Sequence, residues 1–268
     1  QQRGIPFESI QARAENKLRF KECGQWSDRA SRVLAAERGP APDCLKAAGL
    51  LPRVLCALIV GLGLAKSTFF QWVMEKVVPS QFFFRNVNRQ ALAPTATIGI
   101  IAGSSPSIEP PAGNAFMQKT LSGTFVVRNQ NLEALFESKY PALNNATTWA
   151  SIMDQGGSVQ HLDLNDDDKK VFKTAYEINQ RDIVIQAADR QKWISQAQSL
   201  NVFFAPGSSG LISAAYLHDV HFMAWEKGVK SLYYTRSESV LRATSLGDKA
   251  RPSKLIDALA TEECSVCQ

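Results

Sequence analysis

The sequence has few cysteines and few histidines, the residues on which disulfide frameworks and zinc sites depend. Five cysteines and three histidines occur among 268 residues. An odd, sparse set of cysteines in a chain of this length excludes the disulfide framework of a small secreted domain. It favours a reducing compartment, and we therefore expect a cytoplasmic protein.

Long hydrophobic runs are also missing. The most apolar stretch, residues 54–65, is shorter than the ~20 residues that a membrane-spanning helix needs, and Arg53 and Lys66 flank it closely. It predicts a buried helix or strand and no association with a membrane. The chain begins at Gln1 without a methionine or a signal-peptide pattern, so we expect it to be an excerpt of a longer protein.

Charge of one sign is not concentrated anywhere in the chain. The 30 Lys and Arg residues exceed the 25 Asp and Glu residues, which gives a net charge of +5. This mild surplus suits a phosphorylated substrate and is too small to indicate nucleic-acid binding. The one charged run, residues 166–170, is acidic and then basic, which predicts the solvated start of a helix.

A strand–helix–strand pattern is present near the end of the chain. Residues 200–204 predict a strand, 206–210 a turn, 211–227 a helix and 229–234 a second strand, and Gly228 suits the position just after the helix. Short links of this kind imply a parallel strand pair with a right-handed crossover, and so an α/β fold. One apolar face of the helix is expected to face the core: Leu211, Ala215, His218, Phe222 and Trp225.

Three segments carry candidate chemistry, and the first is the loop-rich stretch of residues 93–111. Its small residues allow a ligand to approach the backbone closely, and Thr95 and Thr97 supply hydroxyl groups. A helix that begins near Thr97 would point free N–H groups at a phosphate. Turns of this composition are common and most bind nothing, so the segment alone favours an ordinary loop.

The second segment is the pair Tyr233–Tyr234 at the end of the predicted second strand. Two tyrosines at a strand end commonly reflect amphipathic packing. A phenol can also lose an electron and a proton together, so adjacent phenols can relay a radical. Neighbouring side chains in a regular strand point to opposite faces, so stacking the two rings requires the strand to bend or end there.

The third segment is the C-x-x-C pair of Cys264 and Cys267 near the C-terminus. Half a zinc site, an accidental pair and a redox-active dithiol on a mobile tail all fit this spacing. No second cysteine pair completes a zinc site, and His161, His218 and His221 lie far back in the sequence. The dithiol is the most specific of the alternatives.

Six blocks of the sequence, taken together and in order, resemble the large chain of class I ribonucleotide reductase. They are residues 93–110, 119–129, 157–163, 195–204, 224–237 and 263–267. Residues 1–9 and 35–43 resemble bacterial members of the family. The resemblance covers residues 1–45 and 86–268, and residues 46–85 have no counterpart, which predicts an insertion.

The resemblance implies the later part of a ten-stranded α/β barrel of the ribonucleotide reductase large-subunit type, followed by a flexible C-terminal tail. We expect a partial α/β barrel catalytic domain over residues 1–243, which includes the insertion, and a redox-active tail over residues 244–268. A barrel of this type gathers its substrate at the carboxyl ends of its strands.

The resemblance also assigns roles to residues that match the family's motifs. Tyr233 and Tyr234 fall on a tyrosine pair that passes a radical in from the small subunit. Cys264 and Cys267 fall on a tail pair that re-reduces the active-site disulfide after each turnover. The loop that binds the substrate diphosphate corresponds to Pro94, Thr95, Ala96, Thr97 and Ile98.

Several partners follow from the same resemblance. They are a ribonucleoside diphosphate substrate, a metal-containing small subunit that supplies the radical, thioredoxin or glutaredoxin, and a second large subunit. No cofactor is expected on this segment itself, and nucleotide effectors are expected to bind the N-terminal part that precedes it. The family's radical-bearing cysteine also lies upstream, and Cys23, Cys44 and Cys56 match no motif of the family.

Two other functions remain open. The segment could be a non-catalytic nucleotide-binding fragment that keeps a phosphate-binding loop and a redox-sensitive tail. It could also belong to an ordinary phosphosugar enzyme on an α/β barrel, which needs neither the tyrosine pair nor the tail cysteines. Among single residues, Glu109 could orient a loop or contact substrate, and the structural role is favoured. His161 is expected to be a buried hydrogen-bonding residue.

Overall fold

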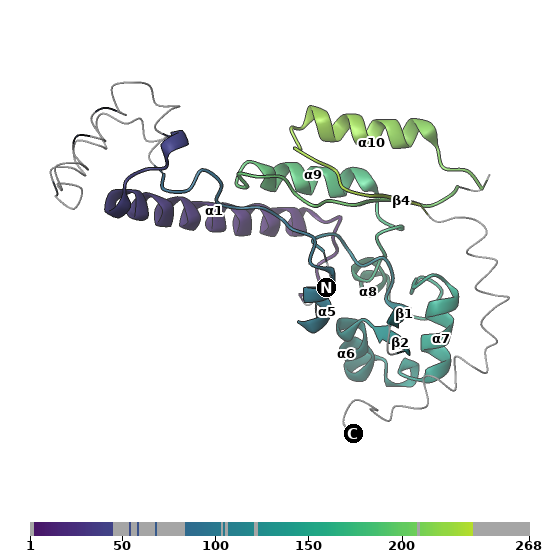
Figure 1. Ribbon diagram of the computed structural model, residues 1–268. Coiled ribbons are helices and arrows are strands. Elements are labelled where there is room, and N and C mark those ends of the chain that lie inside the picture. Colours follow the sequence, from purple (N-terminus) through teal and green to yellow (C-terminus); the bar gives the residue numbers. More distant parts are fainter. Residues whose placement is uncertain are drawn as a thin grey trace. The chain divides into compact units, whose positions relative to one another are not determined.

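The computed structural model describes residues 3–44, 84–102, 104, 107–120, 123–207 and 210–237, together with the isolated residues 54, 58 and 68. The chain divides into two compact units (Figure 1). Unit 1 contains Gln1–Ala14, Ala93–Ala187 and Ser199–Gln268, and unit 2 contains Glu15–Leu92 and Ala188–Gln198. No helix in the described ranges is long and apolar enough to cross a membrane.

The long helix α1 (Ile10–Arg38) supplies, from Glu15 onwards, most of the regular structure of unit 2. The end of the predicted insertion returns along this helix, where the Arg85 N–H donates to the Ser31 carbonyl at 3.1 Å. The Ala41 N–H donates to the Phe84 carbonyl at 2.8 Å. The two flanks of the predicted insertion therefore meet, and its last two residues, Phe84 and Arg85, belong to the packed part of unit 2.

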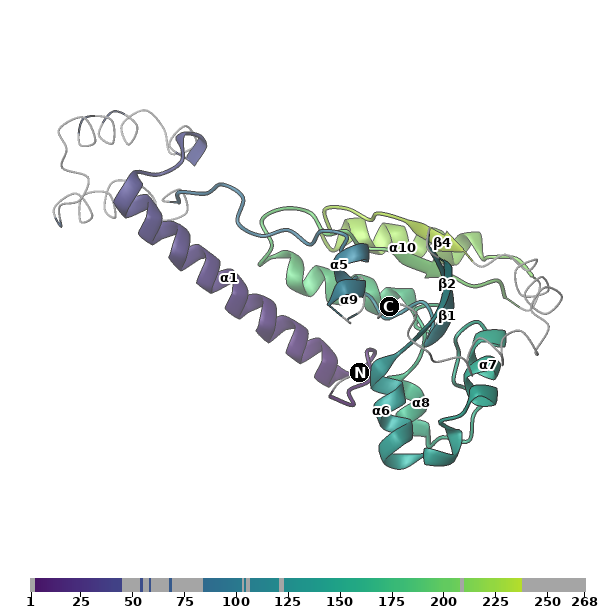
Figure 2. The same ribbon diagram turned by 60° about the horizontal axis from the view of Figure 1, so that its bottom comes forward.

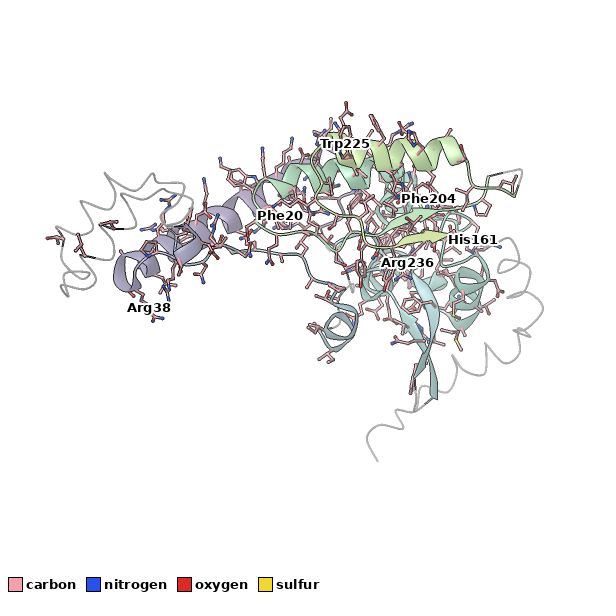
Figure 3. All side chains as sticks on the ribbon, turned by 45° about the horizontal axis from the view of Figure 1, so that its top comes forward. Phe20, Arg38, His161, Phe204, Trp225 and Arg236 are labelled. Atoms are coloured by element: carbon pink, nitrogen blue, oxygen red, sulfur yellow. The ribbon has the colours of Figure 1, made fainter. Side chains whose placement is uncertain are left out.

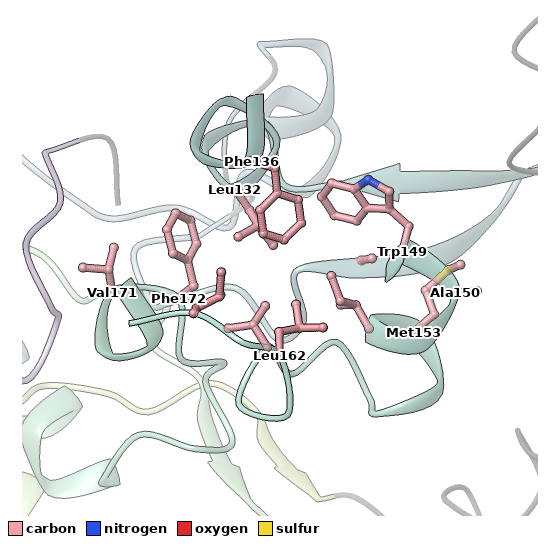
Figure 4. Close-up of a cluster of buried hydrophobic side chains, with 12 residues drawn as sticks. Leu132, Phe136, Trp149, Ala150, Met153, Leu162, Val171 and Phe172 are labelled. Carbon is pink, nitrogen blue, oxygen red and sulfur yellow. The ribbon is translucent and has the colours of Figure 1, made fainter. Parts of the chain in front are cut away.

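One part of unit 1 is a β-hairpin with helices gathered around it (Figure 2). The strands β1 (Ala115–Thr120) and β2 (Gly123–Arg128) pair antiparallel. The helices are α6 (Gln130–Lys139), η3 (Pro141–Leu143), α7 (Ala146–Asp154) and α8 (Asp166–Val171). Their buried side chains form one cluster (Figure 4), which includes Leu132, Phe136, Trp149, Ala150, Met153, Leu162, Val171 and Phe172.

Asparagine side chains start three of these helices. The oxygen of Asn145 accepts the N–H of Thr148 at 2.9 Å before α7, and Asn129 caps α6 in the same way. Before α8, the oxygen of Asn165 accepts the N–H of Asp168 at 2.7 Å. Each contact satisfies an N–H group that the helix itself leaves free. The helix start predicted for residues 166–170 is therefore confirmed.

The other part of unit 1 is the strand–helix–strand pattern that the sequence predicts. Its elements are β3 (Val202–Phe204), α10 (Ala214–Glu226) and β4 (Thr235–Ser237). The helix α9 (Gln180–Gln191) precedes them and is divided between the two units after Ala187. The strands β3 and β4 pair parallel, which confirms the predicted pairing. Phe203 packs in one hydrophobic cluster, and Val202 and Phe204 pack in a second, so β3 is buried on both faces.

The observed boundaries differ from the predicted ones at two places. The helix α10 begins at Ala214, because the Ser213 hydroxyl accepts the Tyr216 N–H at 3.3 Å and so caps the helix. Residues 229–234, predicted as the second strand, are irregular, and the strand follows them as β4. The predicted role of Gly228 after the helix is confirmed by its φ of 72°.

The predicted core face of α10 is wrong. The helix turns its other side inward, where Val220 and Ala224 are buried. Trp225, expected in the core, is 73% exposed (Figure 3). Both stripes are apolar, so the helical period alone could not choose between them, and the small side chain of Ala224 allows close packing against β3. The exposed stripe consists of Leu211, Ala215, His218, Phe222 and Trp225.

The described strands form two sheets of two strands each, so these ranges contain no closed barrel. Along the edge of β3 that faces away from β4, side chains take the place of a neighbouring strand. The Asn201 N–H donates to the carboxylate of Glu109, and the Phe203 N–H donates to the side-chain oxygen of Gln180 at 2.8 Å. In the described part, β3 is therefore an edge strand whose free N–H groups are capped.

Candidate functional site

The predicted phosphate-binding turn leads directly into a short helix, α5 (Ala96–Ile101). The helix begins one residue before the predicted Thr97, and the Gly99 N–H donates to the Thr95 carbonyl at 2.6 Å. By helix geometry, the N–H groups of the first turn have no acceptor within the helix, and such groups can hold a phosphate. The side chains of Ala96 and Thr97 lie outside the part of the chain that is described.

The tyrosine pair lies on an irregular segment just before β4, and its two rings contact each other. The ring centroids of Tyr233 and Tyr234 are 4.2 Å apart, with their planes at 59°. The predicted condition for such a contact is confirmed, because residues 231–234 do not form a regular strand. Both side chains are a little over half exposed, at 55% and 52%.

Polar and charged groups lie close to the tyrosine pair in sequence or in space. A hydrogen bond with Tyr234 raises the pKa of Tyr233 above its ordinary value, and the electrostatic interaction between the phenols acts in the same direction. The guanidinium carbon of Arg236, labelled in Figure 3, lies 5.3 Å from the ring centroid of Tyr234. The Thr235 hydroxyl lies 3.4 Å from Nε2 of His221. Two phenols in contact can pass a hydrogen atom from one oxygen to the other.

Sequence reasoning misses one residue that contacts this pair, Asn201, because a single asparagine beside a strand forms no motif. Its side-chain oxygen accepts the Tyr234 N–H at 3.3 Å, and its own N–H donates to Glu109. Glu109 is only 3% exposed, and its second carboxylate oxygen has no hydrogen-bond partner among the described residues. The orienting role expected of Glu109 agrees with these contacts.

His161 is hydrogen-bonded as expected, but the prediction that it is buried is wrong. Its Nε2 lies 2.7 Å from the hydroxyl of Ser151. Partial shielding from water lowers the pKa of His161 below its ordinary value, and the charge of Lys169 acts in the same direction. Within the described ranges, no three His, Cys, Asp or Glu side chains are grouped closely enough to hold a metal ion.

The predicted tail dithiol, Cys264 and Cys267, lies outside the described residues, and so does Cys56. The described cysteines are free thiols: Cys23 is exposed and Cys44 is buried. Cys44 belongs to a small hydrophobic cluster at the flank of the predicted insertion, which indicates a structural position.

Comparison with known proteins identifies the class. The family model for the ribonucleotide reductase barrel domain matches residues 1–235, so the chain belongs to that family. The matched range contains the turn at residues 94–98 and the tyrosine pair, whereas the two tail cysteines lie beyond it.

Relatives of known name agree with this assignment. The chain is 36% identical over 272 residues to the ribonucleoside-diphosphate reductase large subunit of Invertebrate iridescent virus 3, a match that spans 100% of this chain and 36% of that protein. It is 31% identical over 245 residues to the large subunit of Arabidopsis thaliana, across 90% of this chain and 28% of that protein. The chain therefore spans about a third of the length of these relatives.

A solved structure has a similar fold. It is the alpha subunit of the class Id ribonucleotide reductase of Actinobacillus ureae, with a TM-score of 0.64 and 31% identity over 90% of this chain and 37% of that one. The phosphosugar-enzyme alternative is excluded by the family match. Because the similar proteins come from a virus, a plant and a bacterium, the bacterial type of this chain stays a prediction.

Proposed function

We propose that this chain is the part of a ribonucleoside-diphosphate reductase large subunit that receives the radical and binds the diphosphate of the substrate. The observation that carries the proposal is the contact between Tyr233 and Tyr234, whose ring centroids are 4.2 Å apart. The whole enzyme reduces ribonucleoside diphosphates to deoxyribonucleotides, and this chain contributes about a third of its large subunit.

In the proposed relay, a phenoxyl radical on one tyrosine takes an electron and a proton from the phenol of the other. One O–H bond forms as the other breaks, so charge is conserved and no oxidant is consumed. The phenol of Tyr233 is protonated at neutral pH, because the ordinary pKa of a tyrosine is about 10 and contact with Tyr234 raises it further. A coupled transfer of proton and electron requires that proton.

The proposed diphosphate loop consists of Pro94, Thr95, Ala96, Thr97 and Ile98. The helix α5 begins within this loop. Its first N–H groups and its dipole attract negative charge, as the first turns of helices do in many phosphate sites. The net charge of +5 on the chain acts in the same direction over a longer range.

The proposed reducing shuttle is the tail pair Cys264 and Cys267. A tail thiolate attacks the active-site disulfide, two thiols form there, and the tail leaves as a disulfide that thioredoxin or glutaredoxin reduces. Two electrons and two protons thus pass from the external reductant to the active site. The metal-containing small subunit supplies the radical, a second large subunit completes the dimer, and nucleotide effectors bind the preceding N-terminal part.

Replacing Tyr233 or Tyr234 by phenylalanine in the full-length large subunit tests the relay. We expect turnover with the small subunit to be lost and substrate binding to be unchanged, because the diphosphate loop is untouched. The matched control is Tyr140→Phe, which removes a phenol that donates to Asp168 at 2.8 Å, and this variant should retain turnover. Normal turnover of both Phe variants would contradict the relay. Nucleotide binding without any reduction by the unaltered protein would favour the non-catalytic alternative.

A further inference from the structure

The parallel ladder between β3 and β4 slips by one residue at the tyrosine pair. Val202 lies opposite Thr235, and the Val202 N–H donates to the Tyr234 carbonyl at 3.0 Å, as in a regular ladder. In a regular parallel ladder, the hydrogen bond before this one would run from the Tyr234 N–H to the Leu200 carbonyl. Instead, the Leu200 carbonyl accepts from the Tyr233 N–H at 2.7 Å.

This slip explains how the side chains of sequence neighbours come to lie together. In a regular strand, Tyr233 and Tyr234 would point to opposite faces of the sheet. An extra residue between ladder hydrogen bonds, as in a β-bulge, interrupts that alternation and redirects a side chain. The slip also deprives the Tyr234 N–H of its ladder acceptor.

Asn201 supplies the missing acceptor. Its side-chain oxygen accepts the Tyr234 N–H at 3.3 Å, while its own N–H donates to Glu109. The contact gives the Tyr234 N–H an acceptor within the protein in the slipped arrangement, so it favours the slipped backbone. Glu109 lies in the segment after α5 and is almost completely buried. Its carboxylate contacts Asn201 on the side of β3 that faces away from β4.

We infer that Asn201 is a positioning residue for the tyrosine pair, because its carboxamide holds the slipped backbone that brings the two phenols into contact. Glu109 in turn holds Asn201. The functional meaning of this role rests on the proposed radical relay, whereas the geometry stands without it. Removal of the Asn201 acceptor is expected to release the slip and separate the rings.

The titration of Tyr233 tests the geometry, because contact with Tyr234 raises its pKa. Fluorotyrosine at position 233 of the full-length large subunit, followed by fluorine NMR, measures this pKa. We expect it to fall toward its ordinary value in Asn201→Ala and in the isosteric Asn201→Leu. The matched control is Asn165→Ala, which also removes an asparagine oxygen that accepts a backbone N–H, and it should leave the titration unchanged.

Glu109 offers a second pair of variants. Glu109→Gln keeps an oxygen that accepts the Asn201 N–H, so the titration of Tyr233 should be preserved. Glu109→Leu removes that acceptor, and the titration should shift in the same direction as in Asn201→Ala. A shift in Glu109→Gln as large as that in Glu109→Leu would overturn the role assigned to Glu109.

Turnover separates this inference from the proposed function. With the small subunit present, Asn201→Ala is expected to lower kcat about 10²-fold at unchanged KM, as a displacement of about 1 Å does between reacting groups. An unchanged Tyr233 titration in both Asn201 variants would overturn the positioning role. A shifted titration with an unchanged kcat would keep the positioning role and remove the radical relay.

Discussion

Tyr233 and Tyr234 are adjacent in the sequence, and their ring centroids nevertheless lie only 4.2 Å apart. The contact arises from the backbone, because the ladder between β3 and β4 slips by one residue at this pair and the Asn201 side chain satisfies the N–H that the slip releases. All of these residues belong to unit 1. The contact is therefore a local property of the strand end, which single substitutions can test.

The buried side chain of Gln180 serves three backbone groups. Its Nε2 donates to the carbonyls of Ala175 and Ile178 at 2.9 and 2.7 Å, and its Oε1 accepts the Phe203 N–H at 2.8 Å. Gln180→Leu leaves all three without a partner, so we expect the free energy of unfolding in urea to fall by about 3 kcal/mol or more. Gln160→Leu, at an exposed residue that donates to one carbonyl, should change it by less than about 0.5 kcal/mol. Equal effects of the two substitutions would show that the buried groups find other partners.

The two faces of α10 should respond oppositely to substitution. Val220 is fully buried, so Val220→Ala is expected to lower the free energy of unfolding by about 2 kcal/mol through lost burial and a residual cavity. Trp225 is exposed and contacts Phe222 at a ring distance of 5.4 Å, so Trp225→Gln should cost less than about 1 kcal/mol. Thermal unfolding of this chain measures the stability of both variants. A larger loss of stability in Trp225→Gln than in Val220→Ala would support the helix orientation predicted from the sequence.

Local signals account for the parts of the fold that were predictable. A short strand run, a helical stretch and Gly228 lie close together in the sequence, and they predict the parallel orientation correctly, although the second strand begins after the predicted residues 229–234. The orientation of α10 was not predictable, because two of its stripes are apolar and only contact with β3 selects one. The slip at the tyrosine pair could not be predicted from the sequence for a related reason. It depends on Asn201, which is 33 residues before Tyr234, and on Glu109, which is 92 residues before Asn201.

The imidazole of His161 should titrate below its ordinary pKa of 6.5, because partial shielding from water and the charge of Lys169 both disfavour its protonated form. The unfolded chain then binds the proton more tightly, so His161 favours unfolding as the pH falls below 6.5 and has no such effect above it. NMR titration of Lys169→Gln should show the His161 pKa raised toward 6.5. Lys170→Gln, where the ammonium pairs with Asp167 at 3.0 Å, is the control. Equal shifts in both variants would contradict a specific effect of Lys169.

Removal of the predicted insertion should not weaken the rest of the fold. The Ala41 N–H and the Phe84 carbonyl are 2.8 Å apart, so the flanks can be joined by a short Gly/Ser linker in place of residues 46–82. Phe84 is kept because the guanidinium carbons of Arg32 and Arg89 lie 4.3 and 4.0 Å from its ring centroid. We expect an equal or higher Tm for the shortened chain, and a clear fall in Tm would show that the segment is part of the fold.

The claim that the tyrosine pair carries a radical is tested most directly by electron paramagnetic resonance. Aminotyrosine, which is oxidised more easily than tyrosine, is placed at position 233 or 234 of the full-length large subunit, which is then mixed with the small subunit, substrate and effector and frozen rapidly. The relay predicts an aminotyrosyl radical that grows as the radical of the small subunit decays. Reduction of the nucleotide with no radical at either position would contradict it.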